Sequence, residues 1–164
     1  MRRPALALAL ALLLLPAIAA AQSSEPIGLT ASLSIAGGAE LGLPDGAGSA
    51  GLGELEGAIG YEFESIGLRP ELGVVLGLAP GTDLAFRPGV RLSLPGVPVQ
   101  FRAAFDASTA RVPGMRWRWL LLGVSYELRF TDVLALFGEV DSGAPLNSQA
   151  GLPLLFRAGS TFRF

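Results

Sequence analysis

The sequence predicts an all-β fold: an eight-stranded antiparallel up-and-down transmembrane β-barrel that follows a cleaved N-terminal signal peptide. Three observations support this prediction. Apolar residues make up 51% of the 164 residues, but beyond the N-terminal leader no apolar stretch is long enough for a membrane-spanning helix. The chain contains 22 Gly and 12 Pro, which suits strands and turns rather than helices. Eight segments alternate apolar and polar side chains with a period of two, the pattern of a strand with two different faces.

Residues 1–21 are predicted to form the signal peptide, and residues 22–164 the barrel domain. The leader has a positively charged start, "MRRP", and an apolar run, "ALALALALLLL", that is short for a membrane span. Small residues, "AIAAAQ", surround the expected cleavage site after Ala21. An uncleaved membrane anchor is the alternative, but no longer apolar span follows.

The first four predicted strands each place apolar side chains at every second position. Residues 27–36, "IGLTASLSIA", alternate aliphatic side chains with Thr and Ser. Residues 53–65, "GELEGAIGYEFES", alternate Leu, Ile and aromatic residues with glutamates. Residues 68–79, "LRPELGVVLGLA", and 84–94, "LAFRPGVRLSL", alternate Leu, Val and Phe with Arg, Glu and Gly. Each segment is about the length of a tilted membrane strand, roughly 9–11 residues.

The last four predicted strands continue this alternation. Residues 97–108, "VPVQFRAAFDAS", set Val, Phe and Ala against Gln, Arg and Asp. Residues 117–130, "WRWLLLGVSYELRF", are less regular, and residues 133–142, "VLALFGEVDS", alternate except at the Phe. Residues 152–164, "LPLLFRAGSTFRF", keep the alternation up to the final Phe, so the chain ends inside a strand.

Two kinds of irregularity interrupt the pattern. Pro70 and Pro88 lie inside strands, and because Pro cannot donate to the ladder we expect a bulge at each. Arg116 and Arg118 share parity with Leu120 and the apolar residues after it. Either a bulge near Leu120 switches the faces, or the two arginines point outward above the membrane.

The links between the predicted strands alternate in length. "SIG", "PG" and "TD" are short and suit tight turns, whereas "GGAELGLPDGAGSAGL", "PGTD", "TARVPGMR" and "GAPLNSQAG" are longer. Short turns at one end and longer loops at the other are typical of bacterial outer-membrane barrels. An even number of strands then places both ends of the barrel domain on the short-turn, periplasmic side.

The volume of an eight-stranded barrel predicts which face points inward. A soluble barrel would put the apolar face inside, but that face would supply on the order of 40 large side chains, against the dozen that fill a layered eight-stranded core. The smaller polar face fits the lumen, and buried charges of both signs should pair. Charges that merely face trapped water are the alternative. The candidates for an ion-pair network in the lumen are Glu56, Glu62, Arg69, Glu71, Arg87, Arg91, Arg102, Asp106, Glu139 and Arg157.

Composition excludes several classes of chemistry. Without Cys, disulfides, thiol catalysis and a lipidated N-terminal Cys are excluded, and without His the commonest general base and metal ligand is missing. The net charge of −2 argues against a nucleic-acid partner, and loss of the two leader arginines makes it more negative. We therefore predict no catalytic, cofactor-binding or metal-binding residues.

At this point the whole mature chain resembles the small outer-membrane β-barrel family typified by the transmembrane domain of OmpA and by OmpX. The most specific part of the resemblance is the last strand, which implies a recognition signal for the barrel-assembly machinery at Phe156, Phe162 and Phe164. The resemblance implies export through the periplasm, residence in the bacterial outer membrane, and contact with membrane lipid and lipopolysaccharide. For a chain of this size we expect a monomer. Aromatic girdles at the two membrane interfaces would use Tyr61, Phe63, Trp117, Trp119, Phe130, Phe162 and Phe164.

The expected function is that of a non-enzymatic integral barrel with a structural or surface-interaction role. A small gated, porin-like pore for ions or small solutes is the alternative, in which the ion pairs would have to rearrange. An outer-membrane lipid-modifying enzyme is less favoured, because several such enzymes use a His with a Ser. Three arginines lie in and beside the third outer loop: Arg111, Arg116 and Arg118. Because arginine pairs well with phosphate, we expect these side chains to be candidates for contact with lipopolysaccharide phosphates. The alternative is that they are solvated loop charges with no specific partner.

Overall fold

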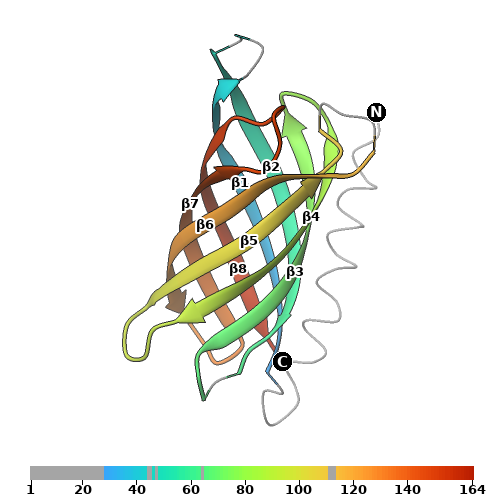
Figure 1. Ribbon diagram of the computed structural model, residues 1–164. Coiled ribbons are helices and arrows are strands. Elements are labelled where there is room, and N and C mark those ends of the chain that lie inside the picture. Colours follow the sequence, from blue (N-terminus) through green and yellow to red (C-terminus); the bar gives the residue numbers. More distant parts are fainter. Residues whose placement is uncertain (1–27, 44–45, 47, 64, 111–113) are drawn as a thin grey trace, which may run out of the picture.

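The computed structural model describes residues 28–43, 46, 48–63, 65–110 and 114–164, so the predicted signal peptide lies outside the described residues. These residues form a closed barrel of eight antiparallel strands, each paired with the next and the last paired with the first (Figure 1). No helix among the described residues is long and apolar enough to cross a membrane. The strands are β1 (Leu29–Leu43), β2 (Gly48–Tyr61), β3 (Leu68–Ala79), β4 (Asp83–Ser93), β5 (Val99–Ser108), β6 (Arg116–Arg129), β7 (Leu134–Pro145) and β8 (Leu152–Arg163).

The barrel closes where its first and last strands meet. β1 and β8 pair from Thr30 opposite Arg163 to Leu41 opposite Leu152. The amide of Phe164 also donates to the carbonyl of Leu29 at 2.9 Å. The start of β1 and the end of β8 therefore lie together, at what we call the terminal end; the opposite end is the far end (Figure 1).

The predicted contrast between short and long links is wrong. The terminal-end links cover 62–67, 94–98 and 130–133, and the far-end links cover 44–47, 80–82, 109–115 and 146–151. The longest predicted loop is largely strand, because β1 runs on past residue 36 and β2 begins before residue 53. Glu40 stays buried at 2% exposure and Leu41 stays outward at 40%, so the period of two continues through this glycine-rich stretch.

The β4–β5 link shows how local sequence sets a tight turn. The amide of Val97 donates to the carbonyl of Leu94 at 3.4 Å, with Pro95 and Gly96 between them. Gly96 has a φ of 76°, which glycine adopts without steric cost. Pro followed by a Gly of positive φ is the signature of a type II turn.

The expected bulges at Pro70 and Pro88 are absent. Pro70 pairs with Val90 and Pro88 with Leu72 in one unbroken register between β3 and β4. The missing N–H groups instead interrupt the ladders on the other side of each strand. The β4–β5 register resumes unshifted after Pro88, and the β2–β3 ladder ends at Glu71, the residue that follows Pro70.

A bulge in β6 resolves its irregular pattern. Asp106 pairs with Trp119 and Ala107 with Trp117, so Arg118 is the extra residue. The first sequence alternative, a switch of faces near Leu120, is therefore the one observed. Trp117 is 52% exposed, whereas Trp119 is fully buried and points inward, so its assignment to an aromatic girdle is wrong.

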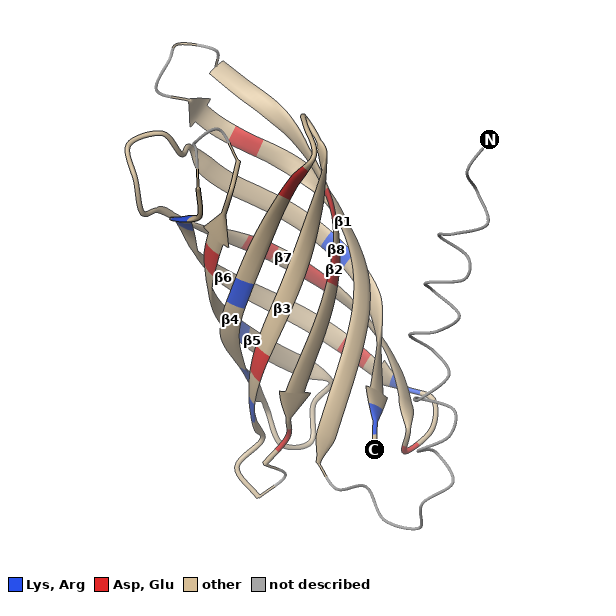
Figure 2. Ribbon diagram, turned by 90° about the vertical axis from the view of Figure 1, so that its right-hand side faces the viewer, with Lys and Arg blue, Asp and Glu red and all other residues tan. Residues whose placement is uncertain are grey.

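The distribution of side chains is the reverse of that in a water-soluble protein. Large apolar side chains along the strands are exposed, including Ile35 (60%), Ile59 (62%) and Phe156 (58%). The buried side chains are to a large extent charged or polar, and Figure 2 shows these charges on strands along the height of the barrel. A soluble barrel would have the opposite arrangement.

Candidate functional site

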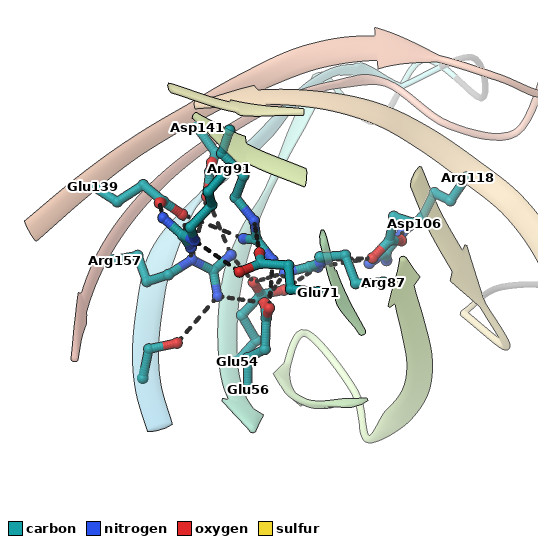
Figure 3. A network of polar contacts seen from close by, with 12 residues as sticks. Glu54, Glu56, Glu71, Arg87, Arg91, Asp106, Arg118, Glu139, Asp141 and Arg157 are labelled. Carbon is teal, nitrogen blue, oxygen red and sulfur yellow. Dashed lines mark hydrogen bonds and ion pairs between the residues drawn. The ribbon is translucent and has the colours of Figure 1, made fainter. Parts of the chain in front are cut away.

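The ten predicted lumen residues are all buried inside the barrel. They come from β2, β3, β4, β5, β7 and β8, with Glu62 directly after β2, so the interior is assembled from distant parts of the chain. They form a central network and a second cluster at the terminal end. The central network consists of Glu54, Glu56, Glu71, Arg87, Arg91, Arg102, Asp106, Glu139, Asp141 and Arg157 (Figure 3).

Arg87 is fully enclosed in the central network, with 0% exposure. Its Nη1 donates to Glu54 Oε1 and to Glu56 Oε2, both at 2.7 Å. Its Nη2 donates to Glu54 Oε2 at 3.0 Å, and its Nε donates to Asp106 Oδ1 at 2.9 Å. One side chain of β4 thus joins carboxylates of β2 and β5.

Arg91 and Arg102 share two acceptors. Arg102 donates to Glu71 Oε1 at 2.7 Å and to Glu139 Oε1 at 3.2 Å, and also to Glu56 Oε1 at 2.5 Å. Arg91 donates to Glu71 Oε2 at 2.8 Å and to the other oxygen of Glu139. Because β4 and β7 are not neighbours in the sheet, the Arg91–Glu139 pair crosses the lumen.

Arg157 links the last strand to this network. It donates to Glu54 Oε1 at 2.9 Å and to Glu56 Oε2 at 2.6 Å, both across β1 from β8. It also donates to Asp141 Oδ2 at 3.1 Å, and its Nε lies 3.2 Å from Glu139 Oε1. Charge-assisted hydrogen bonds of this kind are shorter and stronger than neutral ones.

Inward-facing glycines give these side chains room. A Cβ at Gly73 would lie 2.7 Å from Glu56 Oε1, and one at Gly123 would lie 2.2 Å from Asp141 Oδ1. Gly159 similarly leaves space for the ring of Phe137, whose inward position interrupts the apolar pattern of β7. The glycines are therefore needed for packing inside the barrel as well as for turns.

The second cluster lies at the terminal end. Arg163 Nε donates to Glu62 Oε2 at 2.9 Å, and its Nη2 donates to Glu127 Oε1 at 2.5 Å. Arg129 donates to Glu62 Oε1 at 3.3 Å. Arg69 stands between the two groups, 3.9 Å from Glu71 and 4.0 Å from Glu127, so it joins the cluster loosely to the central network.

The three arginines predicted to contact lipopolysaccharide do not share one environment. Arg111 lies outside the described residues, and Arg116 is exposed. Arg118 turns back toward the lumen: it donates to Asp106 Oδ2 at 2.9 Å, and its guanidinium lies 3.6 Å from the ring centroid of Trp119. Of the described members of this set, only Arg116 therefore offers an unengaged guanidinium to the outside.

The predicted assembly residues lie on the outward face of β8. Phe156 is 58% exposed, and Phe162 and Phe164 are partly exposed near the terminal end. Exposed aromatic residues at this end include Tyr61 and Phe63, whose ring centroids are 5.0 Å apart.

Several interior charges were absent from the predicted set. Glu54 and Asp141 have the same parity as Glu56 and Glu139, so alternation alone could have added them. Glu127 and Arg163 could have been found in the same way from their strands. Arg118 could not, because only the bulge in β6 turns it inward.

The central network separates two hollows. One at the terminal end has a volume of about 660 Å³, and one at the far end about 340 Å³. Within the described part of the chain, no group of three or more His, Cys, Asp or Glu side chains has an arrangement that could hold a metal ion. The site is thus a set of buried, ion-paired side chains inside the barrel.

Comparisons with solved structures identify the fold. The chain is similar to Neisserial surface protein A, NspA, with a TM-score of 0.58 and 14% identity over 86% of this chain and 100% of that one. It is similar to the N-terminal β-barrel domain of Pseudomonas aeruginosa OprF, with a TM-score of 0.54 and 12% identity over 85% of this chain and all of that one. A structure from the de novo design of transmembrane β-barrels gives a TM-score of 0.53 and 16% identity over 87% of this chain and 100% of that one.

No protein-family model and no curated protein matches the sequence. The structural likeness nevertheless defines the class: the chain has the fold of the small eight-stranded outer-membrane barrels. The predicted fold class is confirmed.

Proposed function

We propose that the chain is a non-enzymatic integral protein of the bacterial outer membrane, with a structural or surface-interaction role and a lumen closed by Arg and Glu ion pairs. The observation that carries this proposal is the inverted distribution of side chains. Val124 and Val140 face outward at mid-strand with 50% and 46% exposure, while Arg87 and Asp106 are fully buried. In water this arrangement would be strongly unfavourable, whereas lipid around the barrel makes it favourable.

The closed sheet supports the same proposal. In a bilayer every backbone N–H and C=O group needs a partner within the protein, and a closed barrel is the sheet that supplies one. β1 and β8 pair along their lengths, so no strand is left with an unpaired edge. Export through the periplasm and recognition of β8 by the barrel-assembly machinery are part of the proposal, as is a monomeric state.

A small gated pore is the second candidate, favoured by the hollow at each end of the lumen. Conduction would require the central network between them to open. Planar-bilayer recording of the purified protein across a range of salt and voltage tests this candidate. We expect no channel events, and regular unitary steps would favour the pore.

At the outer rim we propose contact between Arg116 and lipopolysaccharide phosphates. The exposure of Arg116 supports this role, whereas the pairing of Arg118 with Asp106 does not support one for that residue. Co-purification of lipopolysaccharide with the Arg116→Ala variant should fall relative to the unaltered protein. Equal amounts would remove the assignment.

Cell fractionation combined with gel mobility tests the main proposal. The protein should be found in the outer-membrane fraction and should migrate differently before and after heating, because a closed barrel resists detergent until it is boiled. Recovery from the periplasm or cytoplasm as a soluble species would overturn the proposal.

A further inference from the structure

The central network contains one carboxylate more than the guanidiniums that serve it. Its ten members are six carboxylates and four guanidiniums, and Arg118, which donates to Asp106, brings the guanidiniums to five. Arg69 lies 3.9 Å from Glu71, but both oxygens of Glu71 already accept hydrogen bonds from other arginines. One carboxylate is therefore left without a cation of its own.

The hydrogen bonds place this surplus charge on Asp141. Of the twelve carboxylate oxygens in the central network, eleven accept a hydrogen bond from a guanidinium. The exception is Oδ1 of Asp141, which has no hydrogen-bond partner among the described residues although the residue is 0% exposed. Buried polar atoms are normally paired, so this oxygen requires an explanation.

The one arginine paired with Asp141 is shared with three other carboxylates. Arg157 Nη2 lies 3.1 Å from Asp141 Oδ2 (Figure 3). The same guanidinium lies within 3.2 Å of oxygens of Glu54, Glu56 and Glu139. Each of these glutamates is also paired with at least one further arginine, whereas Asp141 has no other cation within 4.0 Å in the part of the chain that the structure describes. The negative charge of an ionised Asp141 would therefore be poorly compensated.

The surroundings of Asp141 oppose a second negative charge on β7. Glu139 lies two residues away on the same inward face, and like charges at this spacing disfavour ionisation of both. β6, which pairs with β7 here, contributes the uncharged Gly123. The charged groups around Asp141 are Glu139 on β7, Arg157 on β8, Arg102 on β5, Arg87 on β4, and Glu54 and Glu56 on β2 through their shared Arg157.

The space beside Oδ1 of Asp141 is too small for a metal ion or an organic cation. This oxygen lies against the backbone of Gly123, where a Cβ would be 2.2 Å from it. The oxygen is also closed to water. A proton is the one cation that needs no additional volume, so it can neutralise Asp141 without any movement of the network.

We propose that Asp141 is a proton-binding site, which holds a proton on Oδ1 while the other five carboxylates of the central network are ionised. The proton removes the surplus charge, and a neutral carboxyl group is far less unfavourable to bury than an unpaired anionic oxygen. Oδ2 continues to accept from Arg157. The site goes beyond the structural role proposed above: it makes the closed lumen sensitive to pH, because loss of the proton leaves an unpaired charge inside it.

Urea unfolding of the refolded barrel in detergent micelles at a series of pH values tests the proton. The chain has no His or Cys, so no side chain with an ordinary pKa titrates near neutral pH. Above about pH 3.9 the unfolded chain releases the proton that folded Asp141 keeps, so rising pH favours unfolding. The unfolding constant should rise by about tenfold per pH unit until the folded barrel also loses the proton. Asp141→Asn should lack this rise, and its presence in the variant or absence from the unaltered protein would overturn the proposal.

Glu139→Gln is the matched control, because it makes the same carboxyl-to-amide replacement two residues away on β7. At mildly acidic pH, Asp141→Asn should unfold at the urea midpoint of the unaltered protein or above it, since an amide is as neutral as a protonated carboxyl. Glu139→Gln should unfold at a lower midpoint, because it removes an ionised partner of Arg91 and Arg102. An Asp141→Asn midpoint below that of the unaltered protein would overturn the proposal, whether or not Glu139→Gln folds.

Infrared spectroscopy of the folded barrel observes the proton directly. A protonated carboxyl group has a C=O stretching band that is separate from the bands of ionised carboxylates. The difference spectrum between the unaltered protein and Asp141→Asn at mildly acidic pH should contain one such band, and this band should disappear as the pH is raised. A difference spectrum that contains only ionised-carboxylate bands at mildly acidic pH would overturn the proposal.

Discussion

Replacement of Arg87 tests the central network at the scale of a single residue. Arg87→Ala leaves Glu54, Glu56 and Asp106 without one of their cations in a site of 0% exposure. Removing one partner of a buried ion pair typically costs about 3–5 kcal/mol. The midpoint of urea unfolding in detergent micelles, followed by gel mobility, should fall accordingly.

Arg129→Ala is the matched control for that experiment. Arg129 also bonds a buried carboxylate, but its side chain is 56% exposed, so water can replace it. Exposed ion pairs are worth about 0–1 kcal/mol. Similar midpoints for the two variants would show that burial of the network has no energetic effect.

Replacement of Gly159 by Ala tests how tightly side chains pack inside the barrel. A Cβ there would lie 2.4 Å from the carbonyl oxygen of Leu33 and 2.9 Å from the ring of Phe137. Gly159→Ala should therefore destabilise the barrel by about 1–3 kcal/mol through overpacking. Gly138→Ala is the control, since its Cβ would meet nothing within 4 Å. Unfolding midpoints of both variants in micelles make the comparison, and equal values would contradict it.

At the scale of an element, β8 combines closure of the sheet with the proposed assembly signal. Deletion of Phe164 removes one backbone hydrogen bond, to Leu29, worth about 0.5–1.5 kcal/mol, so refolding in micelles should persist. In cells, however, the amount of heat-modifiable barrel in the outer membrane should fall, because the terminal aromatic residue is lost.

Phe105→Ala separates the signal from simple loss of an outward aromatic side chain. Phe105 is 48% exposed on β5, far from the end of the chain. This variant should assemble in cells at close to the normal level. If both variants assemble equally well, β8 carries no special signal.

At the scale of the whole molecule, the depth of a charge on the outer face tests the membrane-spanning orientation. Val124 faces outward at mid-strand, paired with Phe101 and Val140, and is 50% exposed. Val124→Arg should destabilise the barrel in lipid vesicles by about 2–4 kcal/mol, because the charge would lie near the bilayer centre. Urea unfolding of the vesicle-inserted protein measures this cost.

Leu78→Arg provides the control for depth. Leu78 is also outward, at 53% exposure, but lies next to the end of β3. Near an interface the cost falls to about 0–1 kcal/mol. If neither arginine is costly, then water rather than lipid surrounds the barrel.

Much of the architecture could be predicted from local pattern. The number of strands, their approximate ranges and the side chains that share a face follow from alternation, because successive side chains of a strand point to opposite sides. Glu54 and Asp141, although left out of the predicted set, obey the same rule.

Other features could not be predicted from local pattern. The glycine-rich stretch before Leu43 and after Gly48 resembles a loop, yet strand pairing carries the ladder through it. The bulge at Arg118 depends on the register between β5 and β6, and so does the burial of Trp119. The prolines suggested bulges, but an unpaired ladder position accommodates each one without a shift of register.

The sequence by itself therefore determined that charges line the interior and apolar side chains cover the exterior, since a period of two separates the two faces and the narrow bore of an eight-stranded barrel fits only the smaller, polar one. Only the tertiary structure decided which charges meet. Arg91 contacts Glu139 across the lumen, although the two residues are 48 positions apart in the sequence. Closure of the barrel and strand register set that contact. Local alternation gives the direction of a side chain, whereas its height along the barrel and its partner depend on how all eight strands are staggered.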